Sequence, residues 1–159
     1  MVLYQIRQAE KSDINAIYQL ERELFGEHCY PDFFFRQAYD CWTSGLLVAV
    51  SECEHVVGYV LSSPSFNAQA ETEREAWILG IAVANKMQGK GVGKALLRET
   101  LAQLANYNRI LLTVHPENNA MKLYQALGFV EMEQEDDYFG CSSPRIKMCL
   151  NSKEQAYIA

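Results

Sequence analysis

The stretch that most constrains this chain lies near its middle, where a strand, a glycine loop and a helix follow one another directly. Residues 75–83, EAWILGIAV, form a mostly apolar run of strand length. Three glycines at alternating positions come next, within NKMQGKGVGKALL at residues 85–97. A helix with apolar positions then runs to about residue 106, and the apolar run RILLTV at 109–114 predicts another strand, buried on both faces. This succession favours a mixed α/β domain with an anion-binding loop at a helix N-terminus.

Two familiar phosphate-binding loops do not fit the glycines. A P-loop needs G-x-x-x-x-G-K-[S/T], but Gln88 stands where its first glycine belongs and Ala95 where its magnesium-binding hydroxyl belongs. A dinucleotide-binding loop needs G-x-G-x-x-G, and its third glycine position is Lys94 or Leu96, depending on the frame. The sequence that remains is Q-x-x-G-x-G.

That pattern, formed by Gln88, Gly91 and Gly93, suits a pyrophosphate. The first turn of a helix leaves N–H groups unpaired, and the helix dipole adds roughly half a positive charge there. Glycines remove the Cβ atoms that would keep phosphate oxygens away from those N–H groups. Lys90 and Lys94 add positive charge, although lysines spaced by four residues also occur simply as a solvated helix face.

The charge distribution points to a small anionic ligand. The net charge is −6, which argues against nucleic acid as a partner. Residues 86–98 nevertheless carry four cations and no anion, while acidic residues cluster at 71–75 and 131–137. A basic island around a glycine loop suits one small polyanion.

Composition gives no sign of a membrane or metal protein. The longest apolar runs have the length of strands, so we expect no membrane span and no membrane partner. The five cysteines are an odd number, widely spaced and without a CxxC pair. We therefore expect reduced thiols, a cytoplasmic protein and no metal site.

The remaining pattern predicts the order β-α-α-β-β-β-α-β-α-β-β in one domain, residues 1–151, followed by a tail, 152–159. Ser12 and Asp13 are the expected cap of the first helix. The other expected elements are strands near 3–10, 46–53, 56–63, 129–136 and 144–150, helices near 14–25, 32–42 and 120–127, and a polar loop from 63 to 73.

Two segments carry a family resemblance. LGIAVANKMQGKGVGKALL and, close to thirty residues later, AMKLYQALGFVEM resemble motifs of the GCN5-related N-acetyltransferase (GNAT) superfamily, and the element order over residues 3–150 is similar too. The resemblance implies a mixed central sheet with helices on both faces. It also implies an acetyl-CoA-dependent N-acetyltransferase that acts on a primary amine by direct attack on the thioester. GEHCYPDFFFRQ and the LY…LGF…DYF end are similar to ribosomal-protein alanine N-acetyltransferases and their protein N-terminal relatives, which implies an α-amino acceptor.

The same resemblance implies where acetyl-CoA binds. The backbone around Ala82 pairs with the pantetheine arm through Ile81 and Val83, and one N–H polarises the thioester carbonyl. An asparagine before the last helix also contacts the cofactor; Asn118 is preferred and Asn119 stays open, since helix capping explains either. The pyrophosphate loop consists of Gln88, Gly89, Lys90, Gly91, Val92, Gly93 and Lys94.

Tyr124 matches the tyrosine that protonates the departing thiolate in the resembled family. A thiol pKa near 8.5 and a tyrosine pKa near 10 make that role reasonable. The alternative is packing beside Leu123 and Leu127.

The general base of the resembled family has no counterpart at the matching positions of this chain. The ribosomal alanine acetyltransferases place a glutamate where this chain has Leu112 and Thr113. Because an α-amino group has a pKa near 7.7–8.0 and lysine one near 10.4, a site without a base favours an α-amine reached through water. Glu75 is the candidate catalytic carboxylate and Glu27 a further one, though each is equally explained as a surface residue.

The acceptor itself is the least determined feature. We expect its site between residues 26–35 and the loop after Tyr138, with at least one of Phe33, Phe34 and Phe35 at the opening and the others in the core. The alternatives to a peptide N-terminus are a polyamine, antibiotic or other metabolite, or a non-catalytic acyl-CoA-binding sensor. A homodimer is compatible with the resemblance.

Overall fold

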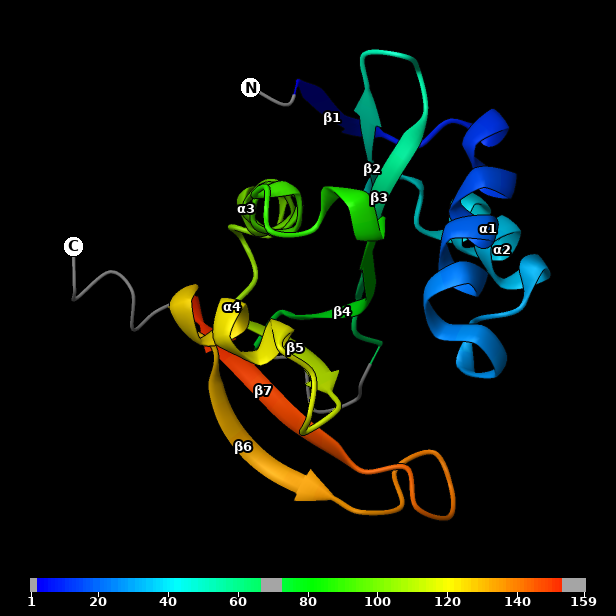
Figure 1. Cartoon of the computed structure of the whole chain (residues 1–159). Helices are drawn as coiled ribbons and strands as arrows, with labels where there is room; N and C mark the ends of the chain where they lie inside the picture. Colours follow the sequence, from blue (N-terminus) through cyan, green and yellow to red (C-terminus); the bar gives the residue numbers. More distant parts are fainter. Residues whose placement is uncertain (1–2, 67–72, 153–159) are drawn as a thin grey trace. The chain divides into compact units, whose positions relative to one another are not determined.

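The computed structural model describes residues 3–66 and 73–152 (Figure 1). Its strands are β1 Tyr4–Gln8, β2 Leu46–Ser51, β3 Val56–Pro64, β4 Glu75–Val83, β5 Arg109–Val114, β6 Val130–Glu135 and β7 Arg145–Asn151. Its helices are α1 Ile14–Phe25, α2 Asp32–Cys41, α3 Val92–Gln103 and α4 Ala120–Ala126. The predicted order of elements is confirmed. The predicted polar loop and the predicted tail lie partly outside the described residues.

The sheet is mixed, as predicted. Its strands are ordered β1-β2-β3-β4-β5-β7-β6, with β4 and β5 parallel. β7 pairs antiparallel with both β5 and β6, so the last strand of the chain lies between two earlier ones. Within the described residues, no helix has the length and apolar character needed to cross a bilayer.

The chain forms two compact units, which we describe separately. The first contains the residues up to Ser63 together with Gly80–Gln103, and therefore β1–β3, the end of β4, and α1–α3. Its strand β2 has five consecutive buried residues, Leu46 to Val50, which only a strand covered on both faces can have. Figure 1 shows α1 and α2 together on one side of these strands and α3 on the other.

Gly58 on β3 shows how closely α3 packs against this strand. A Cβ at this position would lie 3.1 Å from Leu96 Cδ1 of α3 and 3.3 Å from Val92 Cγ1. The next residue, Tyr59, points to the opposite face and contacts α1. Helices therefore cover both faces of this part of the sheet, as predicted.

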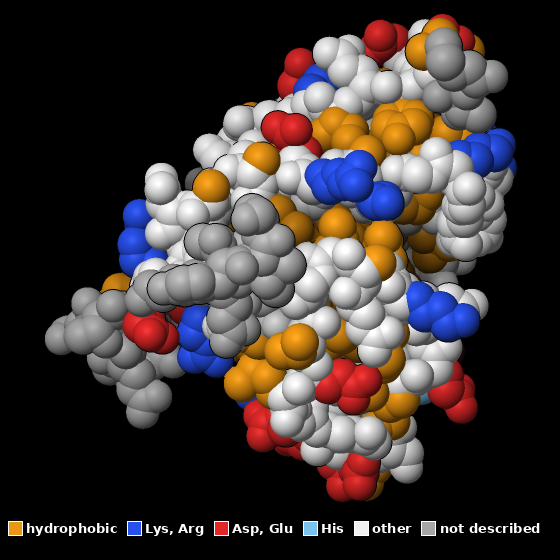
Figure 2. Space-filling view, turned by 90° about the vertical axis from the view of Figure 1, so that its left-hand side faces the viewer, with side chains coloured by type: hydrophobic (Ala, Val, Ile, Leu, Met, Phe, Trp, Pro, Cys, Tyr) orange, Lys and Arg blue, Asp and Glu red, His pale blue; other side chains and the backbone are white. Residues whose placement is uncertain are grey.

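The second unit contains Pro64–Leu79 and the chain from Leu104 onward. The adjacent β5 residues Ile110, Leu111 and Leu112 are at most 4% exposed, which confirms that this strand is buried on both faces. β6 and β7 form the predicted hairpin, and β6 is exposed along its whole length. Acidic side chains gather at the lower end of the surface in Figure 2, at the level of this hairpin.

Two local predictions were wrong. α3 ends at Gln103 rather than near residue 106, because residues 104–106 form a turn. Asp13 precedes α1 but does not cap it with its side chain. Its carboxylate instead accepts hydrogen bonds from Arg7 and from the Glu10 N–H, at 2.6 Å and 2.7 Å.

Candidate active site

The glycine loop of the first unit has the geometry of an anion cradle. Gly89 and Gly91 have φ values of 74° and 83°, a backbone conformation that favours glycine. Ala95 N–H donates to the Gly91 carbonyl at 2.9 Å, which closes the first turn of α3. The N–H groups of the first turn, from Val92 to Lys94, have no partner within α3 itself, because no helical carbonyl precedes them. Since no atom lies within 4 Å of a Cβ placed on Gly89, a phosphate group can approach the loop closely.

Gln88 fixes the start of this loop. Its Nε2 donates to the Val83 carbonyl at 3.0 Å and to Asn85 Oδ1 at 3.2 Å. The side chain therefore ties the loop to the end of β4. Binding of the cofactor by Gln88 stays a prediction, and the same holds for the half-buried Ile81 and Val83 and the buried Ala82.

The cations around the loop are available to a ligand. Lys90, Lys94 and Arg98 are exposed, and none takes part in an ion pair within the described residues. Together with the unpaired N–H groups they make the N-terminus of α3 electropositive. The chemistry of this donor set fits a diphosphate.

Tyr124 lies in the second unit, on α4, and is only 5% exposed. Its ring meets Phe129 edge to face, with 6.0 Å between centroids. Burial raises the pKa of Tyr124 to about 12, although nearby Arg145 acts in the opposite direction. The phenol is therefore protonated at every physiological pH, and packing and proton donation both remain compatible with its place.

Asn118 and Asn119 differ in what they contact. Asn118 Oδ1 accepts a hydrogen bond from Ala120 N–H at 2.8 Å, which stabilises the start of α4. Asn119 occupies the N-cap position without a side-chain hydrogen bond to the helix. The oxygen of Asn118 is thus engaged, and a cofactor contact through its amide stays a prediction.

The candidate bases occupy different environments. Glu75 Oε2 lies 3.3 Å from Arg109 Nη1, so one carboxylate oxygen is already paired within the second unit. Glu27 is exposed, in the turn after α1. On β5, Leu112 is buried and Thr113 half-buried, and these are the two positions where the resemblance led us to look for a glutamate.

The three consecutive phenylalanines of α2 also separate. Phe35 is fully buried, whereas Phe33 is 63% exposed. Phe34 is half-buried and stacks on Tyr30, with 4.3 Å between centroids. Only one of the three belongs to the core, not two as expected. The loop after Tyr138 belongs to the second unit, where Phe139 stacks beneath Arg145 at 5.0 Å.

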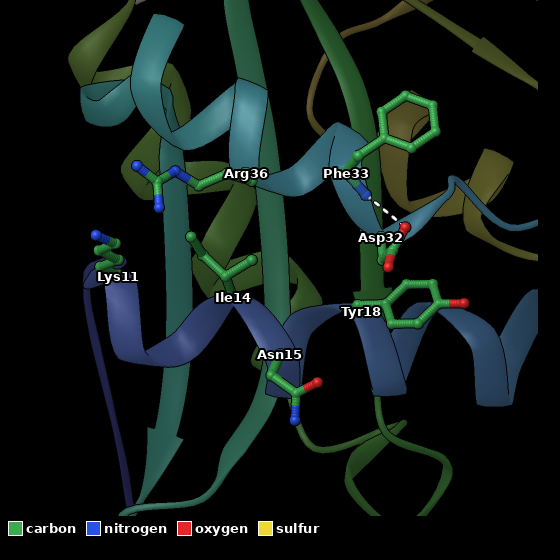
Figure 3. A pocket seen from close by; sticks show the side chains of 7 residues that line it. All are labelled: Lys11, Ile14, Asn15, Tyr18, Asp32, Phe33 and Arg36. Carbon is green, nitrogen blue, oxygen red and sulfur yellow. Dashed lines mark hydrogen bonds between the residues drawn. The ribbon is translucent and has the colours of Figure 1, made fainter.

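A shallow pocket of about 390 Å³ opens between α1 and α2, on the surface of the first unit (Figure 3). Lys11 and Arg36 lie at one end of it, and Tyr18 and Phe33 at the other. Arg36 is already paired with Asp40 at 2.9 Å. No sequence pattern indicated this pocket.

Sequence reasoning also missed a buried polar pair, Glu21 and Tyr59. The two residues are 38 positions apart and are joined by a hydrogen bond of 2.6 Å. A signal existed, because Glu21 follows Ile17 by four residues and therefore lies on the apolar face of α1. A charged residue on that face needs a buried partner.

Comparison with known proteins gives matches to one protein family. The profile of the Acetyltransferase (GNAT) family matches residues 14–129. An N-alpha-acetyltransferase of Sulfolobus acidocaldarius is 31% identical over 145 residues, which cover 86% of this chain and 85% of the relative. A ribosomal protein bS18-alanine N-acetyltransferase of Haemophilus influenzae is 26% identical over 136 residues, covering 84% of this chain and 86% of the relative. The solved structure of Ard1 from Thermoplasma volcanium is similar with a TM-score of 0.82 at 25% identity, over 94% of this chain and 98% of that one.

Proposed function

The chain belongs to the acetyltransferase (GNAT) family, and from that premise we propose that it acetylates the free α-amino group of a protein or peptide. It is an N-acetyltransferase that uses acetyl-CoA, and its single domain has the fold of that family. What the proposal adds is the acceptor and the roles of individual residues.

The cofactor roles follow the geometry of the first unit. We assign the pyrophosphate to the N–H groups of residues 89–94, with Gln88 holding the loop in place and Lys90 and Lys94 adding charge. The backbone from Ile81 to Val83 takes the pantetheine arm as an added strand would. Support comes from the unpaired donors and from the two left-handed glycines.

The bound thioester supplies an activated acetyl group. The amine nitrogen forms a bond to its carbonyl carbon, the C–S bond breaks, and the amine proton leaves to solvent. A backbone N–H of β4 stabilises the oxyanion. By the resemblance to the family, we assign to Tyr124 the role of hydrogen-bond donor to the departing sulfur. The pKa of Tyr124 is about 12, whereas that of a thiol is near 8.5. Proton transfer from the phenol to the thiolate is therefore unfavourable, and Tyr124 stabilises the thiolate mainly by donating a hydrogen bond.

The observation that carries the choice of acceptor is the end of β5, where Leu112, Thr113 and Val114 offer no carboxylate. About a tenth of an α-amine is already neutral at pH 7, whereas neutral lysine is over a hundredfold rarer. A site that relies on water therefore favours the α-amine. The activities of the two relatives that match over four-fifths of this chain, an N-alpha-acetyltransferase and a ribosomal-protein alanine N-acetyltransferase, support the same choice.

We propose water as the first proton acceptor, with Glu75 assisting and Glu27 as the other candidate. The pairing of Glu75 with Arg109 leaves one of its oxygens open. The reaction needs no metal ion in this scheme, so dialysis against a chelator should leave the rate unchanged. A cytoplasmic location and a homodimer belong to the same proposal, and light scattering on the purified protein tests the assembly.

The acceptor is tested by turnover on matched amines, with the acetylated atom located by tandem mass spectrometry. The panel contains peptides with a free N-terminus and an internal lysine, the same peptides with a blocked N-terminus, and small amines. We expect one acetyl group on the free α-amine and none on the blocked peptides.

Other outcomes identify the alternatives. Turnover only on polyamines or other small amines would replace the proposal by a metabolite acetyltransferase. Binding of acetyl-CoA without turnover of any amine would favour a sensor and overturn the proposed acceptor.

A further inference from the structure

A buried carboxylate lies in the first unit, apart from the glycine loop. Glu21 of α1 is 3% exposed, and its Oε2 accepts a hydrogen bond of 2.6 Å from the hydroxyl of Tyr59, which is 1% exposed on β3. Its Oε1 accepts the Tyr30 N–H at 3.2 Å. None of the ion pairs within the described residues includes Glu21. One carboxylate thus ties together α1, β3 and the segment that leads into α2.

The same cluster contacts β4. A Cβ placed on Gly80 would lie 2.9 Å from the Tyr59 hydroxyl oxygen and 3.4 Å from Tyr30 Cε2. A side chain at this point of β4 would crowd both rings, so Tyr59 and Tyr30 lie directly against the backbone of Gly80. Gly80 immediately precedes Ile81, where we place the pantetheine arm.

Aromatic rings extend the cluster outward. Tyr30 stacks on Phe34 at 4.3 Å, and Phe35 meets both Tyr59 and Phe34 edge to face, at 5.4 Å and 5.6 Å. Phe34 is half-buried, so this ring borders the surface. The Glu21 carboxylate thus binds the backbone of the residue whose ring stacks on Phe34.

Folding alone does not require a carboxylate here. A buried ionised group is costly unless it is fully hydrogen-bonded, and well-packed apolar residues of similar volume are often at least as stabilising. Burial raises the pKa of Glu21, although the hydrogen bonds from Tyr59 and Tyr30 oppose that effect. Hydrogen bonds depend on the angle between donor and acceptor, whereas apolar contacts do not. The pair can therefore hold the neighbouring segments in one orientation.

We propose that Glu21 and Tyr59 are positioning residues that hold Tyr30 and Phe34 against β4 at Gly80, and so determine which first side chain of the acceptor is admitted. This inference rests on the proposed function, because it takes the acceptor α-amine to approach β4 beside this segment. Neither residue touches the reacting atoms.

Two variants test the role of the pair. Tyr59→Phe removes the hydroxyl alone, and the double variant Glu21→Met with Tyr59→Phe replaces the pair by apolar side chains. Ile17→Val is the control, because Ile17 is fully buried on the same helix and its aliphatic side chain cannot form a hydrogen bond with the carboxylate. For each variant we measure the acetyl-CoA Kd, kcat and KM on peptides with a small or a large first residue, and hydrogen exchange at the Tyr30 amide.

Positioning predicts a specific pattern. Tyr59→Phe and the double variant should raise the peptide KM about tenfold and change the preference between small and large first residues at least about fivefold, with kcat within about threefold. The acetyl-CoA Kd should stay within about twofold. Tyr30 should lose amide protection, and Ile17→Val should alter none of these values.

A purely structural role predicts the opposite. A double variant that keeps its melting temperature together with wild-type KM and selectivity overturns the inference, as does an equal KM change in Ile17→Val. Should the double variant not fold, unchanged Tyr30 exchange in Tyr59→Phe overturns it.

The failure of the proposed function has a different signature. If the wild-type enzyme acetylates small amines but no peptide, the proposed acceptor is wrong, and selectivity between a small and a large amine decides the positioning role. If no amine is acetylated, both proposals are overturned.

Discussion

At the residue scale, Tyr124 carries the most testable role. Its hydroxyl belongs to a ring that is 5% exposed and packed on Phe129. We expect Tyr124→Phe to lower kcat about a hundredfold, as the loss of one preorganised hydrogen-bond donor does, because the thiolate then leaves without a hydrogen bond. Calorimetry should give an acetyl-CoA Kd within about twofold of the wild-type value. A large loss of affinity with little change in kcat would make Tyr124 a binding residue instead.

The raised pKa of Tyr124 also predicts the pH dependence. A protonated amine is not a nucleophile, so kcat/KM for a peptide should rise about tenfold per pH unit until the α-amine pKa near 7.7–8.0, and then level off. Because burial raises the pKa of Tyr124 to about 12, the plateau should extend to pH 10. A pH–rate profile measured on stable protein checks this. A fall between pH 9 and 10 that Tyr124→Phe abolishes would contradict it.

Glu75 separates a water-assisted reaction from one with a dedicated base. Its carboxylate is paired with Arg109 at 3.3 Å. If water accepts the proton, Glu75→Gln should lower kcat/KM less than about tenfold, well under the effect of losing a general base. Steady-state kinetics on one peptide decides the point, and a loss of two or more powers of ten would assign the base to Glu75.

At the element scale, the start of α1 depends on an interaction that the sequence did not predict. Asp13 was expected to cap the helix, but its carboxylate binds backward, to Arg7 and to the Glu10 N–H. Burial raises its pKa, and the hydrogen bonds from Arg7 and Glu10 more than compensate, so the pKa of Asp13 is lowered overall. An aspartate before a helix can accept hydrogen bonds from the helix that follows or from the segment that precedes it. Tertiary contacts, here with Arg7, determine which of the two it binds.

The lowered pKa of Asp13 predicts a pH-dependent stability. Ionised Asp13 should stabilise the fold above its unfolded pKa near 3.9, and this contribution should be lost as the pH falls through the lower folded pKa. Asp13→Asn should therefore cost about 2 kcal/mol of unfolding free energy at pH 7 and much less near pH 3. Urea unfolding at both pH values measures it. Asp40→Asn, which breaks the exposed pair with Arg36, is the control and should cost under about 1 kcal/mol; an equal loss would contradict the account.

Local patterns predicted the elements far better than their long-range pairing. Hydrophobic periodicity and the glycines predicted every strand and helix, because strands and helices are encoded within a few neighbouring residues. The insertion of β7 between β5 and β6 and the bond between Glu21 and Tyr59 join residues far apart in sequence. The sequence indicates that Glu21 needs a buried partner, but it does not indicate which distant residue that partner is.

At the scale of the whole molecule, the proposed cofactor site is a cationic region on an acidic protein. The chain carries a net charge of −6, yet residues 86–98 are cationic and include the N-terminus of α3. The candidate cofactor loop could be predicted from the sequence, because consecutive residues form it and their backbone N–H groups are the proposed ligands. The acceptor site was not, because side chains from separate segments shape it.

The most direct test of the central claim is calorimetric titration of the protein with acetyl-CoA. We expect the wild-type chain to bind and Gly91→Asp to lose at least about tenfold in affinity, because a carboxylate there repels the diphosphate and occupies the cradle. Gly140→Asp is the matched control, since Gly140 also has a positive φ, 106°, but lies in the loop between β6 and β7; it should bind as the wild type does. No binding by the wild-type chain, or undiminished binding by Gly91→Asp, would contradict the account.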